Sequence, residues 1–447
     1  MRPVNRAAPS ARNQQIAGRL RASGPGAAIA LAAWAGLIVG AHLWANELIE
    51  SRGGIGLGAP PLFGAWDLHL GAGILGAAAV AALGILYAPR LAERLAWRPL
   101  LWAAFGGTLA WALALALSAG SSGLFDPLAS PFEYLAGVPF VDSPGDYLDN
   151  FTRDLDPYPV HVRSHPPGLV LGLWGLDQIG LGGPKPASIL IVLIGASAVP
   201  AALIAARSIA GEESARRAAP FLVLAPAAIW LATSADALFM GVGAWAVAAT
   251  VLALAAEGRR SRRLAIAGGV LFGLCALLSY GLVLLAIIPL AVAAVDRRLE
   301  PLIVVGAIAA LVICVPLIWG FWWLDGYEAV REEYETSVAK DRPYGYFVFG
   351  NLAAFGLATG PALAVALGRL RLQRAFILPL AGLVVVAVAD LSGMSKAEVE
   401  RIWLPFFPWV MLATAALPVR PTWIRPALLG AGAALAIAIE VGVEIPW

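Results

Sequence analysis

The sequence contains few of the residues that stabilise small domains or form metal sites. It has 2 cysteines and 4 histidines in 447 residues. Both cysteines, Cys275 and Cys314, lie inside apolar runs, so neither a disulfide framework nor a zinc site is indicated. The sequence also lacks a Gly-rich phosphate loop and the GxGxxG, HExxH and CxxC motifs. Nucleotide-driven chemistry in the cytoplasm is therefore unsupported.

Charged residues are scarce as well. They make up 13% of the chain and hydrophobic residues 60%, whereas a soluble globule has about 25% charged residues. Mean hydropathy is +0.78, which excludes a soluble globule. The net charge of +2 gives no reason to expect a nucleic-acid partner. The 16 tryptophans fit a membrane protein with two aromatic interfacial belts.

Apolar runs long enough to cross a bilayer as helices, about 17–25 residues each, recur along the chain. They begin near Ala27, Gly71, Leu101, Ser188, Ala218, Leu238, Leu264, Leu282, Leu302, Leu352, Phe376, Ile402 and Leu428. The sequence therefore predicts an all-α, polytopic transmembrane helical bundle of about 13 spans. We expect one such domain over residues 27–447, after a basic cytoplasmic tail at residues 1–26.

Arginine-rich links between the spans predict the orientation. They lie at residues 90–98, 207–217, 259–263, 297–298, 369–374 and 420–425. The positive-inside rule places all of them in the cytoplasm of a plasma-membrane protein. The polar segments 119–186, 325–350 and 392–402 must then face outward. This assignment requires Gly168–Ile179, about 12 residues and too short to span, to lie along the outer interface.

The first outer segment holds the densest group of ionisable residues. Its carboxylates include Asp126, Glu133 and Asp146, the candidate general bases. It also contains YPVHVRSHPPG, with His161, Arg163 and His165 in one short polar stretch. Pro166 and Pro167 after His165 favour a helix start there, and a histidine at a helix start can donate to a ligand oxygen. The alternatives are a solvated acidic loop and a histidine that only caps the helix.

A second set of candidates lies late in the chain, in SKAEVERIW. Lys396 and Glu400 are four residues apart and share a helical face, and Arg401 follows. Basic residues are unusual on an outer face, and Arg342 adds another in the second outer segment. We therefore expect Lys396, Arg401 and Arg342 to hold the phosphate of a lipid-linked substrate. The alternative is that they extend from the lipid boundary into water without a ligand.

Two short motifs resemble the C-type superfamily of polytopic membrane glycosyltransferases. This superfamily includes the protein O-mannosyltransferases, the lipid A aminoarabinose transferases and the actinobacterial arabinosyl and mannosyl transferases. His165-Pro-Pro-Gly resembles the HPPL or KPPL that opens a juxtamembrane helix after the first outer loop, and ADALF around Asp236 resembles a PDAL-like element at an outer helix end. Gly168 replaces the usual leucine, and two apolar runs precede the span that matches the family's first. The acidic signature is not a clean pair, so the resemblance does not place the catalytic carboxylate on one residue.

The resemblance implies an inverting glycosyltransferase of cell-wall biosynthesis. It would move a sugar from a polyprenyl-phosphate donor to an envelope glycan, lipid or protein acceptor on the outer face. Glu133, Asp146 and Asp126 are the candidate bases. The candidate substrate-binding residues are His161, Arg163, His165, Asp236, Arg342, Lys396, Glu400 and Arg401. A divalent cation is left open, because these families differ in their use of metal. The Ala/Gly/Arg-rich composition also resembles actinobacterial membrane proteins.

Two other functions compete with this one. A transporter or flippase of a lipid-linked or anionic substrate could use the same outer vestibule, but it needs ionisable groups along the spans. Nearly all charges here lie at helix ends, and Asp390 lies near an outer end. A non-catalytic scaffold for envelope assembly is the third possibility.

Overall fold

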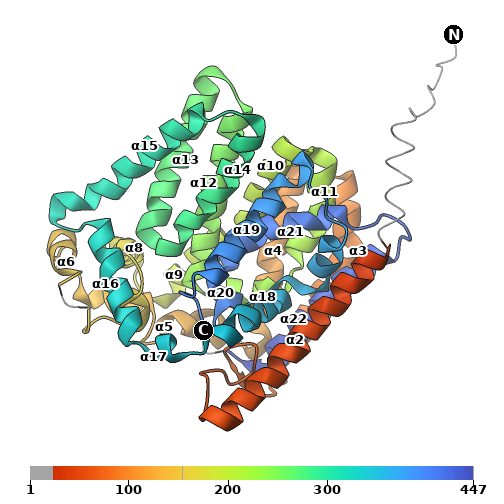
Figure 1. Ribbon diagram of the computed structural model, residues 1–447, viewed down its shortest axis with the longest axis horizontal. Helices are drawn as coiled ribbons and strands as arrows, with labels where there is room; N and C mark the ends of the chain where they lie inside the picture. The colour runs from red at the N-terminus through yellow and green to blue at the C-terminus, as the bar shows by residue number, and fades with distance from the viewer. Residues whose placement is uncertain (1–23, 154, 446–447) are drawn as a thin grey trace.

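The computed structural model describes residues 24–153 and 155–445. Residues 1–23 of the expected tail lie outside this range, and the first described helix, α2 (Gly24–Arg52), includes the last three residues of the expected tail. The described chain is a bundle of helices (Figure 1). The predicted all-α, polytopic fold class is confirmed.

Ten helices among the described residues are long and apolar enough to cross a membrane. One is the continuous stretch Pro184–Ala210, made of α9 (Pro184–Ala196) and α10 (Ala198–Ala210). The 3₁₀ turns Arg374–Phe376 and Val315–Trp319 extend α19 and α15. The others are α2, α3 (Ile74–Arg94), α4 (Trp97–Ala116), α12 (Ala235–Ala255), α13 (Gly258–Leu278), α15 (Glu300–Cys314), α18 (Tyr344–Leu367), α19 (Ile377–Leu391) and α22 (Ile424–Gly442). The chain is thus a multi-pass membrane protein.

The remaining three expected spans are helical but broken. They are α11 (Glu212–Val223) followed by the 3₁₀ helix Pro226–Leu231, the 3₁₀ helix Tyr280–Ala286 followed by α14 (Ile287–Asp296), and α21 (Phe407–Met411) between the 3₁₀ helices Leu404–Phe406 and Leu412–Ala416. Prolines 226, 405 and 408 start turns within two of these segments and cannot donate a main-chain hydrogen bond. The expected number of about 13 spans therefore stays a prediction.

Helix α12 lies at the centre of the bundle. It is apolar on all sides, and most of its residues from Ala235 to Leu254 are buried. A helix that is hydrophobic all round belongs in a core. Its first turn carries one carboxylate, Asp236, which is only 6% exposed. The core helix thus presents an acidic group at its N-terminal end.

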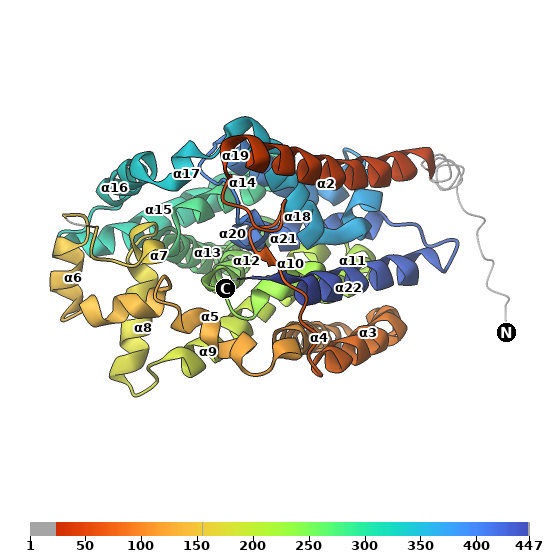
Figure 2. The same cartoon turned by 90° about the horizontal axis from the view of Figure 1, so that it is seen from below.

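Short helices gather at one end of the bundle. They are α5 (Ser122–Ala129), the 3₁₀ helix Tyr134–Phe140, α6 (Pro144–Asn150), α7 (Val160–Arg163), α8 (Gly168–Gln178), α16 (Trp323–Thr336), α17 (Val338–Asp341) and α20 (Val399–Ile402). Helices α6, α8 and α16 lie at the left in both views (Figures 1 and 2). The ion pair between Arg163 and Glu333 joins the first polar segment to the second at 3.2 Å. Lys396 donates to the oxygen of Lys340 at 2.8 Å, which joins the third segment to the second.

Helix α8 begins directly after Pro166-Pro167, as the sequence predicted, and its 11 residues are too few to cross a bilayer. Because these contacts join them, the polar segments 119–186, 325–350 and 392–402 all lie at the same end of the bundle. Which side of the membrane this end faces stays a prediction.

A single pair of strands within the described ranges joins an early loop to the segment that follows the last helix. Strand β1 (Ala65–Trp66) pairs antiparallel with β2 (Val443–Glu444), so the loop after α2 is held against the end of α22. Gly64 is required beside this pair, because a Cβ there would lie 2.3 Å from the Glu444 oxygen. The position of the loop after α2 is consequently fixed by its contacts with β2.

Candidate active site

Four segments from distant parts of the chain bring charged side chains together at the polar end of the bundle. Glu133 precedes the 3₁₀ helix Tyr134–Phe140, His161 is on α7, Asp236 opens α12, and Arg401 is on α20. Glu133 is 2% exposed and Arg401 is 4% exposed. A buried charge is stable only when it is paired. We call these four residues, together with Glu398, the acidic cluster.

The guanidinium of Arg401 is at the centre of the acidic cluster. Its Nη1 lies 3.2 Å from Oδ2 of Asp236 and 3.7 Å from Oε1 of Glu133. Its Nη2 lies 3.1 Å from Oε2 of Glu398. Nδ1 of His161 lies 2.9 Å from the same Oε1 of Glu133. Three carboxylates thus surround one guanidinium, and the cluster carries more negative than positive charge.

The position of His161 indicates where its ring proton lies. Nε2 of His161 is 3.5 Å from Nη2 of Arg401. A guanidinium can only donate, so the contact is favourable when Nε2 carries no proton. The proton then lies on Nδ1, on the side of Glu133. His161 therefore presents a hydrogen to the carboxylate while it accepts from Arg401.

Aromatic rings close one side of the acidic cluster. The ring of Tyr134 lies 6.1 Å from that of His161 and 5.5 Å from that of His165. Phe239, one turn along α12, lies 5.8 Å from the ring of His165. Nδ1 of His165 is 3.0 Å from the main-chain oxygen of His161. Burial lowers the pKa of His165 to about 4, so its ring is neutral at physiological pH.

The carboxylate of Glu133 is ionised at neutral pH. Burial alone would raise its pKa, but the hydrogen bond of His161 and the charge of Arg401 outweigh burial and hold the pKa below its usual value. Oε2 of Glu133 has no hydrogen-bond partner within the described part of the chain. A buried oxygen without a partner is costly. Glu133 therefore has one oxygen fixed by the protein and a second, buried oxygen without a partner among the described residues.

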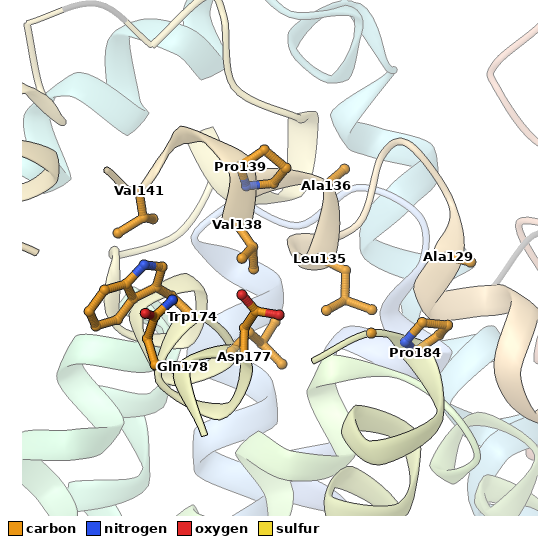
Figure 3. Close-up of a pocket in the computed structure, with 12 residues that line it drawn as sticks. Ala129, Leu135, Ala136, Val138, Pro139, Val141, Trp174, Asp177, Gln178 and Pro184 are labelled. Carbon is orange, nitrogen blue, oxygen red and sulfur yellow. The ribbon is translucent and has the colours of Figure 1, made fainter. Parts of the chain in front are cut away.

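A groove of about 550 Å³ opens beside the element that follows Glu133 (Figure 3). Leu135, Ala136 and Val138 form one wall, and α8 forms the facing wall. Most of the lining is apolar, and Trp174, Asp177 and Gln178 supply an aromatic ring and polar groups from α8. Apolar walls with a few polar groups are typical of small-molecule sites.

The other two candidate bases lie outside the acidic cluster. Asp126 and Asp146 are exposed. Asp146 lies in the first turn of α6, where Oγ of Ser143 donates to its carboxylate at 2.7 Å and accepts from its main-chain N–H at 3.1 Å. This reciprocal pair caps the helix, which is a structural role.

Four of the expected substrate-binding residues also lie outside the cluster. Arg163 pairs with Glu333 and is 27% exposed at the side chain. Arg342 donates to the main-chain oxygen of Lys396, whose own amine donates to the oxygen of Lys340. Oε1 of Glu400 accepts the N–H of Phe63 at 3.0 Å, which ties α20 to the loop after α2. His161, His165, Asp236 and Arg401 are the expected binding residues that the structure brings together with Glu133.

Glu398 was not predicted. Its signal in the sequence was its position three residues before Arg401, which is near enough for the two side chains to pair. No group of three or more histidine, cysteine or carboxylate side chains is arranged to hold a metal ion in the described ranges. The use of a divalent cation, which the sequence left open, is not tested by these residues.

No family model matches the sequence, and no curated protein matches it. A solved structure titled the crystal structure of ArnT from Cupriavidus metallidurans in the apo state is similar over 65% of this chain, at 17% identity and a TM-score of 0.41. The match covers 60% of that protein's chain. Fold does not determine the reaction, so the side chains of the site have to support any functional conclusion.

Proposed function

We propose that this protein is a membrane glycosyltransferase that moves a sugar from a polyprenyl-phosphate donor to a hydroxyl of an envelope glycan, lipid or protein. The observation that carries the proposal is the state of Glu133. It is buried, ionised and fixed through one oxygen by His161 and Arg401, while its other oxygen has no partner among the described residues. An ionised carboxylate with an oxygen that lacks a partner can accept a substrate proton as a general base.

In this reaction Oε2 of Glu133 accepts the proton of the acceptor hydroxyl. The acceptor hydroxyl donates to Oε2, and its proton moves to Glu133 as the acceptor oxygen bonds to the anomeric carbon. The bond from that carbon to the phosphate oxygen breaks at the same time, and polyprenyl phosphate leaves with the electron pair. The attack comes from the face opposite the phosphate, so the sugar centre is inverted.

The charge of the acidic cluster indicates which end of the donor lies against it. Asp236, Glu398 and Glu133 outnumber the one guanidinium. Positive charge develops on a sugar ring as its glycosidic bond breaks, and nearby carboxylates stabilise it. A phosphate is repelled by the same carboxylates. We therefore place the sugar at the cluster and the phosphate toward Arg163, which is partly exposed and lies two residues after His161.

The test is release of polyprenyl phosphate by purified protein in nanodiscs, supplied with synthetic polyprenyl-phosphate pentoses and hexoses. We expect Glu133→Gln to lower turnover by about 10²–10⁴-fold. Glu328→Gln, which changes an exposed glutamate on α16, is the matched control and should keep full turnover.

If the wild-type protein releases no more polyprenyl phosphate than Glu133→Gln from any donor, the proposal is contradicted. If the same protein then moves lipid-linked sugar between the leaflets of proteoliposomes, the flippase function replaces it.

A further inference from the structure

The loop between α19 and α20, residues 392–398, has an unusual backbone just before Arg401. Ala397 has φ 74° and Glu398 has φ 62°, so two consecutive residues with a Cβ adopt the left-handed region. This conformation is unfavourable for residues other than glycine. It persists where the surrounding structure holds it, and such residues concentrate at functional sites.

One segment of the chain, residues 334–351, holds the main-chain oxygens of this loop. The loop has no helix or strand between Gly393 and Glu398, so its oxygens need partners outside regular structure. The donors to the loop are Tyr334 Oη to Gly393 O at 2.9 Å, Arg342 Nη1 to Lys396 O, and Asn351 Nδ2 to Ser395 O at 2.8 Å. Tyr344 Oη donates to the oxygen of Leu391, the last residue of α19, at 3.0 Å.

Asn351 differs from the other donors because its amide both donates to the loop and accepts from it. It is 2% exposed. Its Nδ2 donates to Ser395 O and also to Oδ1 of Asp390 at 3.0 Å. Its Oδ1 accepts the N–H of Ala397, the first left-handed residue, at 3.3 Å. Asp390, at the end of α19, orients the amide so that its oxygen faces Ala397.

The left-handed turn decides where Arg401 lies. The main-chain oxygen of Glu398 accepts the N–H of Arg401 at 3.0 Å and that of Ile402 at 2.9 Å, which starts α20. The carboxylate of Glu398 also pairs with the Arg401 guanidinium. A change in the backbone at Ala397 and Glu398 would therefore rotate the first turn of α20 and move the guanidinium relative to Asp236 and Glu133.

We propose that Asn351 is a positioning residue for the active site: it holds Ala397 and Glu398 left-handed, and thereby sets Arg401 against the acidic cluster. The three hydrogen bonds of Asn351 go to Asp390, Ser395 and Ala397, which lie outside the acidic cluster, so it acts through the loop. The effect on turnover rests on the proposed function, whereas the effect on the loop does not.

The test uses a bypass. Asn351→Ala removes all three hydrogen bonds, and Ala397→Gly makes the left-handed conformation accessible without them, because glycine lacks a Cβ. Thr359→Ala, at a buried threonine of the same helix that bonds only within α18, is the matched control. Asn351→Ser serves in place of the alanine variant if that variant is not recovered folded. Hydrogen–deuterium exchange of residues 392–402 reports the loop, and release of polyprenyl phosphate reports turnover.

We expect Asn351→Ala to speed exchange in residues 392–402 and to lower kcat by about 10–100-fold, because small misplacements of catalytic groups are costly. KM should change little. The double variant Asn351→Ala/Ala397→Gly should recover most of the protection and of kcat, whereas Thr359→Ala should change neither.

Unchanged exchange in Asn351→Ala, or a double variant no better than the single one, overturns the proposal, since a residue that only packs α18 would not be rescued by glycine. If exchange speeds up in Asn351→Ala and recovers in the double variant, but the wild-type protein shows no turnover, the positioning role stands and the proposed function is contradicted.

Discussion

Replacing Glu400 with glutamine tests how a buried carboxylate in α20 contributes to stability. Glu400 is 2% exposed, and Oε2 has no hydrogen-bond partner among the residues described. Burial raises the pKa of Glu400 to about 7 from 4.5, although the N–H of Phe63 opposes this rise. Because the folded state holds the proton more tightly, its contribution to stability is fully present below pH 4.5. It is lost as the pH rises through 7.

The size of the effect follows from this pKa difference. Between pH 5 and pH 8 the linkage removes about 2–3 kcal/mol from the free energy of unfolding. Glutamine keeps an oxygen for the N–H of Phe63 and has no proton to lose. Its extra amide hydrogens add a cost that does not depend on pH. The diagnostic quantity is therefore the change with pH in the stability difference between Glu400→Gln and the wild type.

The assay is thermal unfolding in detergent at pH 5, 6, 7 and 8, followed by tryptophan fluorescence. We expect the variant to gain stability relative to the wild type as the pH rises. The exposed Glu328→Gln variant should show a constant difference. Parallel stability curves for Glu400→Gln and the wild type would refute a raised pKa at this site.

Four further outcomes are expected. Asp126→Asn and Asp146→Asn should keep turnover of polyprenyl-phosphate sugars within a few-fold, since both carboxylates are exposed; a loss of 10²-fold or more in either would move the base away from Glu133. The acid limb of kcat/KM should lie below pH 4.5, because the pKa of Glu133 is lowered and its carboxylate stays ionised until the pH falls through that pKa; a limb near pH 6 or 7 would contradict the assignment of Glu133 as the base. Arg401→Gln should cost about 3–5 kcal/mol of stability, because it leaves buried carboxylates without their partner, and Arg401→Lys should cost less; near-wild-type melting of the glutamine variant would show that the guanidinium is not buried among them. In intact cells, a cysteine at Val338, which is 80% exposed, should react with an impermeant reagent, and one at Leu372, which is 91% exposed, should not; the reverse pattern would invert the topology.

The placement of Arg401 differs from what its position in the sequence suggested. Next to an apolar run and on the expected outer face, it was expected to bind a lipid phosphate or to extend into water. In the structure it is buried and bound to three carboxylates of its own chain. Its neighbour Glu400 points to the main chain of Phe63 instead of to a substrate. The sequence could not separate these roles, because one residue of offset on a short helix decides which side chain faces which neighbour.

Composition and the spacing of apolar runs were enough to predict the fold class, since length and hydropathy alone decide whether a helix suits a bilayer. The Pro-Pro step predicted the start of α8, because proline acts on the local backbone. Residue type also indicated Glu133, His161, Asp236 and Arg401 as candidates.

Only the tertiary structure decided that these four meet and that Asp126 and Asp146 do not join them. His161 and Arg401 are 240 residues apart in the sequence, and their contact depends on how α7 and α20 pack at the end of the bundle. The partners that keep a buried loop carboxylate ionised come from helices that local sequence patterns do not connect.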